Sequence, residues 1–306
     1  LHKNPDFEIY EFGLSFNPFF NGMKNIPWKF IPNVPPEFLN IQTEQELERY
    51  KEWCSHPVNN LGGPLYNSVL LEVQPDIVIA NNDEWNLRYL IESPLRRFYK
   101  LICLFACDSS PQKLEWIESM SRTDKVLVYS NWAKKTIESQ SPKIKVNVAS
   151  PSTQPEFRPL DKTKVRTSFG LDKDVNIIGT VMRNQPRKQF PSLFSAFKKY
   201  LDNTKSTNTY LWVHARFPDN AWPFPSLIQD YGITNRVFFT YICTNNKCNA
   251  VFPAHYQDIA VCPNCNEISG IMPGTTAGIN SDDLCRVYNA FDVTTIYSSS
   301  EGFGIP

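Results

Sequence analysis

The sequence predicts an α/β protein with two domains, each built around a parallel β-sheet. Short apolar segments alternate with longer amphipathic segments along most of the 306 residues. This βαβα order is typical of parallel sheets that helices cover on both faces. A stretch rich in Pro and Ser, residues 150–160, interrupts the alternation and is typical of a domain linker. Each half of the chain is long enough to bury a hydrophobic core of its own.

The first half begins with an alternating segment, residues 7–12, that predicts a strand. Residues 13–43 are rich in Asn, Pro and Phe without periodicity, so we expect a long loop there. Thr43 followed by Glu46 has the spacing of a capping box and predicts a helix over residues 44–54. The elements that follow are helices at 64–73, 111–120 and 131–138, a helix that ends near 91, and strands at 75–80, 101–106, 125–129 and 145–149.

The second half continues the same alternation. We predict helices at 161–169, 190–201, 226–231 and 281–289, and strands at 175–182, 210–213, 236–242 and 291–297. The last of these segments is apolar and rich in β-branched residues, so we expect a buried parallel strand there.

The bulk composition excludes some classes of function. Lys and Arg together number 31, as do Asp and Glu, so the formal net charge is zero. A protein whose main partner is nucleic acid requires a surplus of basic residues, so we expect no nucleic-acid partner. No apolar run approaches the length of a membrane span, which predicts a cytoplasmic protein, free or peripheral to a membrane, rather than an integral membrane protein. The initial Leu without a signal-peptide pattern, and the abrupt end at Pro306, suggest a fragment.

Four of the eight cysteines are clustered in two pairs that thirteen residues separate. They are Cys243, Cys248, Cys262 and Cys265. Two such pairs supply four thiolates for one tetrahedral Zn²⁺, and four protein ligands leave no open position, so we expect a structural site. Two disulfides are an alternative, as is a site in which His255 replaces one cysteine. Because the other cysteines are scattered singly, a metal site in a reducing compartment is favoured over a disulfide framework.

Two loops of the second half carry the candidate chemistry. In the first, Arg183, Arg187 and Lys188 lie between a predicted strand and a predicted helix. Fixed cations there could stabilise negative charge on a bound group. In the second, Glu301 lies before closely spaced glycines that let backbone N–H groups approach a ligand. A solvated basic loop and a generic strand-to-helix turn are the alternatives.

These residues carry a resemblance to a known family. The segment "YNAFDV…SSSEGFGIP" resembles the donor-site signature of retaining GT-B glycosyltransferases, family 4 in particular, in which a Glu-x7-Glu motif follows this strand. Glu301 matches the first Glu, and the second would lie beyond the last residue of this sequence. Arg183 and Lys188 match the family's Arg and Lys in order and approximate spacing. Gln189 stands where the family usually has Gly.

The resemblance implies a GT-B fold of two Rossmann-like domains that face a cleft. Residues 1–152 would form the N-terminal, acceptor-side domain, with the strand at 7–12 as its second strand and the first strand missing. Residues 153–306 would form an incomplete C-terminal domain for the nucleotide sugar, with a zinc-ribbon insert at 243–265. The segment Phe157-Arg158-Pro159 is similar to the family's interdomain segment.

The resemblance also implies an activity. The protein would transfer a sugar, with retention of configuration, from a UDP- or GDP-linked donor to an unidentified glycan, lipid or protein acceptor. No catalytic metal is expected, because Arg183 and Lys188 would stabilise the negative charge on the diphosphate leaving group, as a divalent ion does in other enzymes. Glu301 would accept hydrogen bonds from the donor sugar. The further donor-binding candidates are Arg187, Gly302, Phe303, Gly304, Ile305, Ser130 and Asn131.

Asp108 is the remaining catalytic candidate. It follows the predicted strand at 101–106, and family members often place a His or an Asp near the end of that strand. A helix N-cap at Asp108 or Ser109 is the alternative, and Ser130 could likewise be a cap. His214 is expected to be a packed side chain rather than a ligand-binding one. The rival functions are a non-catalytic GT-B-like scaffold whose zinc ribbon recruits a partner, and a different reaction on the same fold, such as sugar-nucleotide epimerisation.

Overall fold

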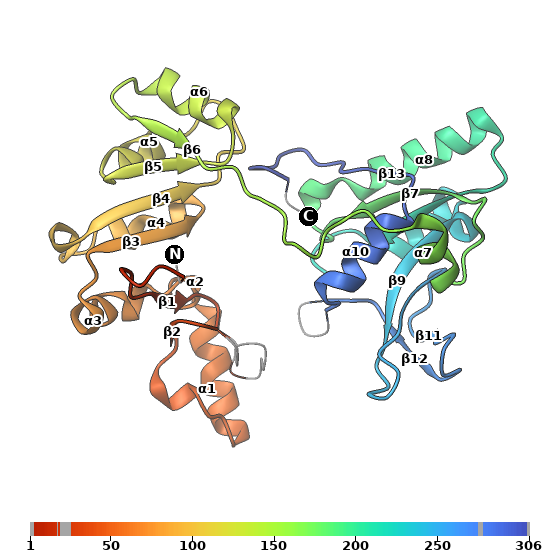
Figure 1. Ribbon diagram of the computed structural model, residues 1–306, viewed down its shortest axis with the longest axis horizontal. Helices are drawn as coiled ribbons and strands as arrows, with labels where there is room; N and C mark the ends of the chain where they lie inside the picture. Colours follow the sequence, from red (N-terminus) through yellow and green to blue (C-terminus); the bar gives the residue numbers. More distant parts are fainter. Residues whose placement is uncertain (1–2, 17, 19–25, 275–277, 305–306) are drawn as a thin grey trace. The chain divides into compact units, whose positions relative to one another are not determined.

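The computed structural model describes residues 3–16, 18, 26–274 and 278–304. The chain forms two compact units, Leu1–Pro151 and Ser152–Pro306, and each is described by itself (Figure 1). Within the described residues, no helix is both long enough and apolar enough to cross a bilayer.

The first unit is built on a parallel four-stranded sheet in the order β3-β4-β5-β6. The strands are β3 (Ile77–Asn82), β4 (Lys100–Phe105), β5 (Lys125–Val128) and β6 (Val146–Val148). The helices that connect them are α4 (Glu84–Ile91), α5 (Leu114–Ser121) and α6 (Asn131–Gln140). Leu101, Cys103 and Phe105 alternate inward on β4 and are completely buried. Most of these elements begin and end within three residues of the predicted positions.

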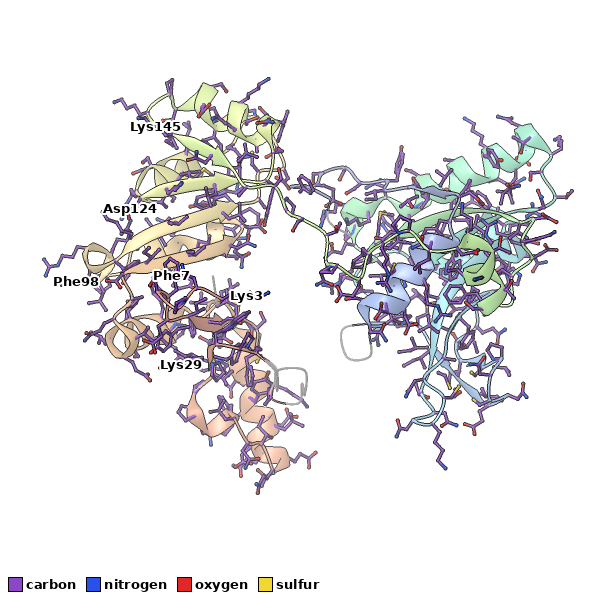
Figure 2. The ribbon with its side chains drawn as sticks, in the orientation of Figure 1. Lys3, Phe7, Lys29, Phe98, Asp124 and Lys145 are labelled. Atoms are coloured by element: carbon purple, nitrogen blue, oxygen red, sulfur yellow. The ribbon has the colours of Figure 1, made fainter. Side chains whose placement is uncertain are left out.

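Asp124 anchors the start of β5 to β4. Its carboxylate, labelled in Figure 2, lies in the first unit. It accepts hydrogen bonds from the Leu101 amide at 2.8 Å, from Arg96 at 2.5 Å and from Lys100 at 3.0 Å. The amide bond of Leu101, with the two ion pairs, holds the pKa of Asp124 well below its usual range. The carboxylate therefore stays ionised and ties the two neighbouring strands together at neutral pH.

The beginning of the chain departs from the prediction. The strand there is β1 (Tyr10–Gly13), and it pairs in parallel with β2 (Lys29–Pro32) in a separate two-stranded sheet. The expectations of a second strand of the main sheet and of a continuous loop over 13–43 were therefore wrong. The pairing partner of β1 lies within a stretch that has no alternating pattern, so periodicity did not indicate it.

Three α-helices lie between β2 and β3 in the sequence. They are α1 (Glu44–Ser55), α2 (Pro57–Asn60) and α3 (Gly63–Val73). The predicted capping box of α1 is confirmed: Thr43 Oγ1 accepts from the Glu46 amide, and the Glu46 carboxylate accepts from the Thr43 amide at 2.9 Å.

The second unit contains a seven-stranded sheet in the order β11-β12-β9-β8-β7-β13, with β10 also paired to β9. Four strands are parallel: β7 (Asn176–Val181), β8 (Thr209–His214), β9 (Val237–Cys243) and β13 (Val293–Thr294). Three are antiparallel to their neighbours: β10 (Val251–Ala254), β11 (Ala260–Val261) and β12 (Ile268–Ile271). The helices are α7 (Lys162–Ser168), α8 (Phe190–Thr204), α9 (Phe224–Asp230) and α10 (Ser281–Ala290).

The last strand is shorter and more exposed than predicted. Within 291–297 only Val293 and Thr294 form a strand, and the Val293 side chain is 57% exposed. Its neighbour Phe291, in contrast, is buried. The reason is that β13 lies at the outer end of the described sheet order, so one of its edges has no neighbouring strand. The expected parallel pairing with β7 is present.

Phe291 is buried because its ring lies directly against β7. A Cβ added at Gly179 would lie 2.0 Å from this ring. We therefore expect Gly179→Ala to lower the free energy of unfolding by about 1–3 kcal/mol, because the overlap cannot be relieved without moving β7 or Phe291. Urea unfolding of the protein measures this. Gly278→Ala is the matched control, since its added Cβ finds its nearest neighbour at 3.7 Å; equal stability of the two variants would contradict the prediction.

Candidate functional site

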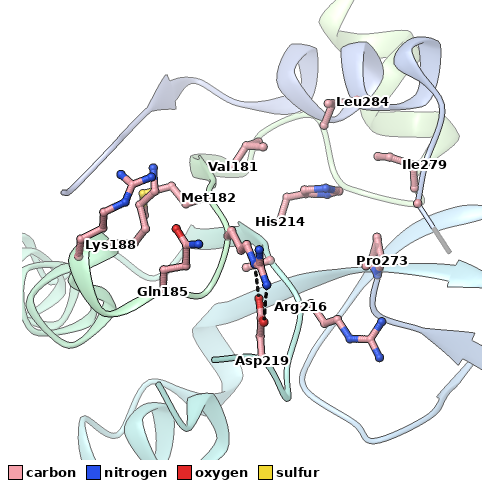
Figure 3. A pocket seen from close by; sticks show the side chains of 15 residues that line it. Val181, Met182, Gln185, Lys188, His214, Arg216, Asp219, Pro273, Ile279 and Leu284 are labelled. Atoms are coloured by element: carbon pink, nitrogen blue, oxygen red, sulfur yellow. Dashed lines mark hydrogen bonds and ion pairs between the residues drawn. The ribbon is translucent and has the colours of Figure 1, made fainter. Parts of the chain in front are cut away.

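The second unit contains a cavity of about 610 Å³ at the carboxyl ends of β7 and β8. Its walls come from the basic loop 181–188, the segment 214–219 after β8, residues 273–274, and residues 278–284 before and within α10 (Figure 3). The carboxyl edge of a parallel sheet is the usual place for a ligand, because the loops there leave the strands together.

The structure brings the two predicted motifs together, although they are 113 residues apart. The Arg187 carbonyl accepts a hydrogen bond from the Ser299 amide at 2.9 Å, and Arg187 Nη1 donates to the Ser300 carbonyl at 3.0 Å. Arg187 and Lys188 both form ion pairs with the Glu301 carboxylate, the first at 2.7 Å. The basic loop and the Glu301 loop are therefore one site.

Lys188 is a buried cation and Glu301 is its counter-ion. The Lys188 side chain is 8% exposed, whereas that of Arg187 is 43% exposed. Burial by itself would raise the pKa of Glu301, but the hydrogen bonds from Arg187 and Lys188 outweigh it and lower the pKa. Glu301 is thus ionised at neutral pH, and the buried ammonium is neutralised before any ligand enters.

Arg183 is held by a residue that the sequence did not indicate, Asp219. Arg183 Nε and Nη2 donate to the two Asp219 oxygens at 3.1 and 3.3 Å. These hydrogen bonds raise the pKa of Arg183 and lower the pKa of Asp219. A fourth cation, Arg216, also lines the cavity and has neither an ion pair nor a hydrogen bond within the described part of the chain. Cationic groups therefore outnumber carboxylates here, which suits an anionic ligand.

Two contacts fix the path of the basic loop. Asn184 is completely buried and exchanges two hydrogen bonds with the Trp222 backbone, at 2.8 and 2.9 Å. Gln189 has a φ of 42° and a ψ of 42°, in the left-handed region. Glycine adopts this conformation without strain, which explains physically why a glycine suits this position better than the Gln189 found here.

His214 lies on the cavity wall, and the expectation that it is a packed side chain rather than a ligand-binding one stays a prediction. Burial lowers the pKa of His214 to about 4, so the ring is neutral at pH 7. The sequence held no motif around it; its position at the end of β8 was the one available signal.

The remaining predicted site residues are placed as follows. Asp108 is exposed in the loop after β4, and since α5 begins at Leu114 with Lys113 as its N-cap, Asp108 caps no helix. Ser130 is the N-cap of α6 and accepts a hydrogen bond from the Ala133 amide at 3.1 Å. Asn131 is exposed in the first turn of that helix. All three belong to the first unit, whereas the cavity belongs to the second.

The loop after Glu301 is described as far as Gly304, which has a φ of 83°, so a glycine is needed there. Gly302 and Phe303 precede it in the same loop, and Ile305 lies outside the described residues.

The four clustered cysteines have the geometry of a metal site. Their Sγ atoms all lie within 4.8 Å of one another, with Cys243–Cys265 at 3.7 Å and Cys248–Cys262 at 3.6 Å. Zn–S bonds of about 2.3 Å at tetrahedral angles place sulfurs about 3.8 Å apart. All four thiols are free, so the disulfide alternative was wrong. The alternative ligand His255 instead hydrogen-bonds the Val237 carbonyl and packs against Phe238.

The two cysteine pairs form matching turns. The backbone amides two residues after Cys243, Cys248 and Cys265 donate to their sulfurs. The residue after each pair, Asn249 or Asn266, has a left-handed backbone with φ of 48° or 59°. Amide donors aimed at sulfur stabilise thiolates, which are the form that binds a metal.

The segment that carries the four cysteines, residues 243–265 (the ribbon), is continuous with the sheet of the second unit. Ile242 pairs with Val251 of β10 and with Ile271 of β12, so the end of β9 lies between these two strands. Phe252 and Cys262 pack in the same hydrophobic core as Phe239. After β12, the chain leads directly to Pro273 and Gly274 on the cavity wall.

Comparison with models of protein families gave no match, and comparison with curated protein sequences gave none. Among solved structures, this chain is similar to sucrose-phosphate synthase from Thermosynechococcus elongatus, with a TM-score of 0.64 and 14% identity over 97% of this chain and 67% of the other. The fold is GT-B. A glycosyltransferase from Rickettsia africae is also similar, with a TM-score of 0.50 and 14% identity over 89% of this chain and 60% of the other.

The predicted GT-B fold, with its parallel sheets, is therefore confirmed. At this level of identity the likeness concerns the fold alone, and this chain spans about two thirds of the first protein and three fifths of the second. Function has to be argued from the site, because one fold supports many reactions.

Proposed function

We propose that this protein is a glycosyltransferase, resembling family 4, that moves a sugar with retention from a nucleoside-diphosphate donor to an acceptor hydroxyl. The observation that supports this most is the contact between the basic loop and Glu301 beside a cavity with a cationic surplus. The bond between the sugar carbon and the diphosphate oxygen breaks, and its electron pair stays on the diphosphate. The acceptor oxygen bonds to the sugar carbon, and its proton passes to the departing diphosphate oxygen.

In this proposal, Lys188 and Arg183 stabilise the charge that develops on the diphosphate, and Arg187 assists them. Such preorganised cations act more strongly in a partly buried site than in water. Glu301 accepts hydrogen bonds from the sugar hydroxyls, and the backbone amides of Gly302 and Gly304 bind sugar or phosphate. With these cations in the charge role, a catalytic metal is not needed. Asp108, Ser130 and Asn131 stay predictions as acceptor- or donor-side residues.

The resting pairs suggest how the site accepts a ligand. Glu301 neutralises Lys188 and Arg187, and Asp219 orients Arg183 through two hydrogen bonds. An entering donor places phosphate oxygens on the cations and sugar hydroxyls on the Glu301 carboxylate. The charges are therefore positioned in advance, so little reorganisation is required when the bond breaks.

The four clustered cysteines would hold a structural Zn²⁺, which supplies a cross-link within the ribbon. Their spacing fits four thiolate ligands and leaves no open position for a substrate. Free thiols in this arrangement suit a reducing compartment, so a cytoplasmic location stays our prediction.

Calorimetric titration of the full-length protein with UDP, GDP and ADP tests the proposed function. We expect binding of UDP or GDP, weakened about 10- to 100-fold by Arg183→Gln, because a hydrogen bond to a charged group contributes about 1.5–3 kcal/mol. Arg158→Gln, at an arginine that is 58% exposed in the same unit, is the control and should bind normally. Absence of binding to all three nucleotides would contradict the proposal and favour a scaffold role.

A further inference from the structure

A buried hydrogen-bond chain leads from the core of the second unit to the cavity. Trp212 Nε1 donates to Thr240 Oγ1 at 3.0 Å, and the same oxygen lies 3.1 Å from His214 Nδ1. Trp212 and His214 belong to β8, and Thr240 belongs to the adjacent strand β9. Trp212 and Thr240 are completely buried, so solvent does not complete their hydrogen bonds.

This chain determines which nitrogen of His214 carries the proton. An indole N–H can only donate, so the Thr240 oxygen accepts from Trp212. The hydroxyl proton of Thr240 then needs an acceptor, and within the described residues the partner available to it is His214 Nδ1. A buried hydroxyl that is left unpaired destabilises the fold. Nδ1 therefore accepts, and in the neutral ring the proton lies on Nε2.

The Nε2–H group has no hydrogen-bond partner within the part of the chain that the structure describes. The ring lines the cavity and points away from Lys188, toward the side formed by Ile279 and Leu284 (Figure 3). Ile279 and Leu284 give this part of the wall an apolar surface, and His214 places one neutral donor beside it, while the cations of the basic loop lie on the other side of His214 (Figure 3). A nucleoside diphosphate likewise joins an anionic diphosphate to a base and ribose that carry no charge.

We propose that His214 Nε2–H donates a hydrogen bond to an oxygen of the nucleoside part of the donor, and that Thr240 is the positioning residue that holds this tautomer. The inference rests on the proposed function and adds a specificity residue to it. Because the ring is neutral, it adds no attraction for phosphate. Its hydrogen bond therefore favours a nucleoside diphosphate over anions that lack a nucleoside. The cations that line the cavity bind any diphosphate, so they alone cannot make that distinction.

Calorimetry with UDP, GDP and inorganic pyrophosphate tests this assignment on two variants of the full-length protein. His214→Asn keeps an amide oxygen near the Nδ1 position, where Thr240 donates, but lacks a group at the Nε2 position. We expect it to weaken binding of UDP or GDP about 3- to 10-fold, the loss of one neutral hydrogen bond, and to leave pyrophosphate binding unchanged. His214→Gln reaches the Nε2 position with an amide and should recover part of the loss.

An unchanged nucleotide affinity in His214→Asn would overturn the inference, as would an equal loss for pyrophosphate. In both cases the proposed function would stand, because the parent protein still binds nucleotide. If the parent protein binds no nucleotide, the proposed function falls and this inference falls with it.

The tautomer has its own readout. Long-range ¹H–¹⁵N spectra of the imidazole in the unsubstituted protein should show the Nε2–H form, and Thr240→Ser should preserve it. Thr240→Val should lose the fixed tautomer and weaken UDP or GDP binding as His214→Asn does. An Nδ1–H ring in the unsubstituted protein would overturn the assignment, and this measurement is independent of whether Thr240→Val folds.

Discussion

Lys188→Met should reduce sugar transfer, measured as kcat/KM, by on the order of 10²- to 10³-fold. The ammonium is the most buried of the ion-paired cations at the site, so neither water nor another lysine can replace its charge at the diphosphate. Methionine has nearly the same length and leaves no large void. Glu301 keeps its 2.7 Å ion pair with Arg187, so the loop should remain folded. The measurement is the initial rate of transfer by the full-length protein with the nucleotide sugar that calorimetry identifies.

Lys198→Met is the matched control for that experiment. Lys198 lies on α8, in the same unit, and pairs with Asp202 on a partly exposed helix surface. An exposed pair of this kind contributes about 0.3–0.5 kcal/mol, so its loss should leave transfer within twofold of the parent rate. If Lys188→Met behaved like Lys198→Met, the role of Lys188 at the leaving group would be wrong, whatever the overall function.

Cys265→Ser should lower the melting temperature of the second unit by roughly 10 °C or more and abolish metal binding. A structural metal contributes its binding free energy to folding, and three ligands hold it much less tightly than four. The effect should extend beyond the ribbon, because Cys262 and Phe252 share a hydrophobic core with Phe239 of the central sheet. Metal content by mass spectrometry and thermal unfolding of the same sample measure both effects.

Cys285→Ser is the appropriate control. Cys285 is buried in the same unit but lies outside the cluster, and its thiol donates to the Arg158 carbonyl, a bond that a serine hydroxyl can also make. We expect a small change in melting temperature and full metal content. A protein that purifies without metal, or two serine variants of equal stability, would contradict the structural metal site.

The sequence by itself determined the features that depend on short stretches of chain. Thr43 and Glu46 are three residues apart, so the capping box of α1 follows from local geometry. The cysteines of each pair are separated by at most four residues, so each turn can be recognised without knowledge of the fold. The regular alternation of strands and helices likewise predicted the parallel sheets, because periodicity is a property of each segment alone.

The tertiary structure decided everything that depends on distant neighbours. Exposure of Val293 follows from its place at the sheet edge, and the pairing of β1 follows from β2, which has no alternating pattern. Arg183 and Lys188 could be proposed from their motif, but the counter-ions Asp219 and Glu301 lie 36 and 113 residues further along the chain.

His214 shows this limit most clearly. Its tautomer depends on the Thr240 hydroxyl of the neighbouring strand and on the Trp212 indole that donates to that hydroxyl. A lone histidine in a sequence holds no information about which nitrogen is protonated, because that is set by the partner of the other nitrogen. The position of the His214 proton therefore depends on how β8 and β9 pack together, whereas the presence of a histidine there can be read from the sequence.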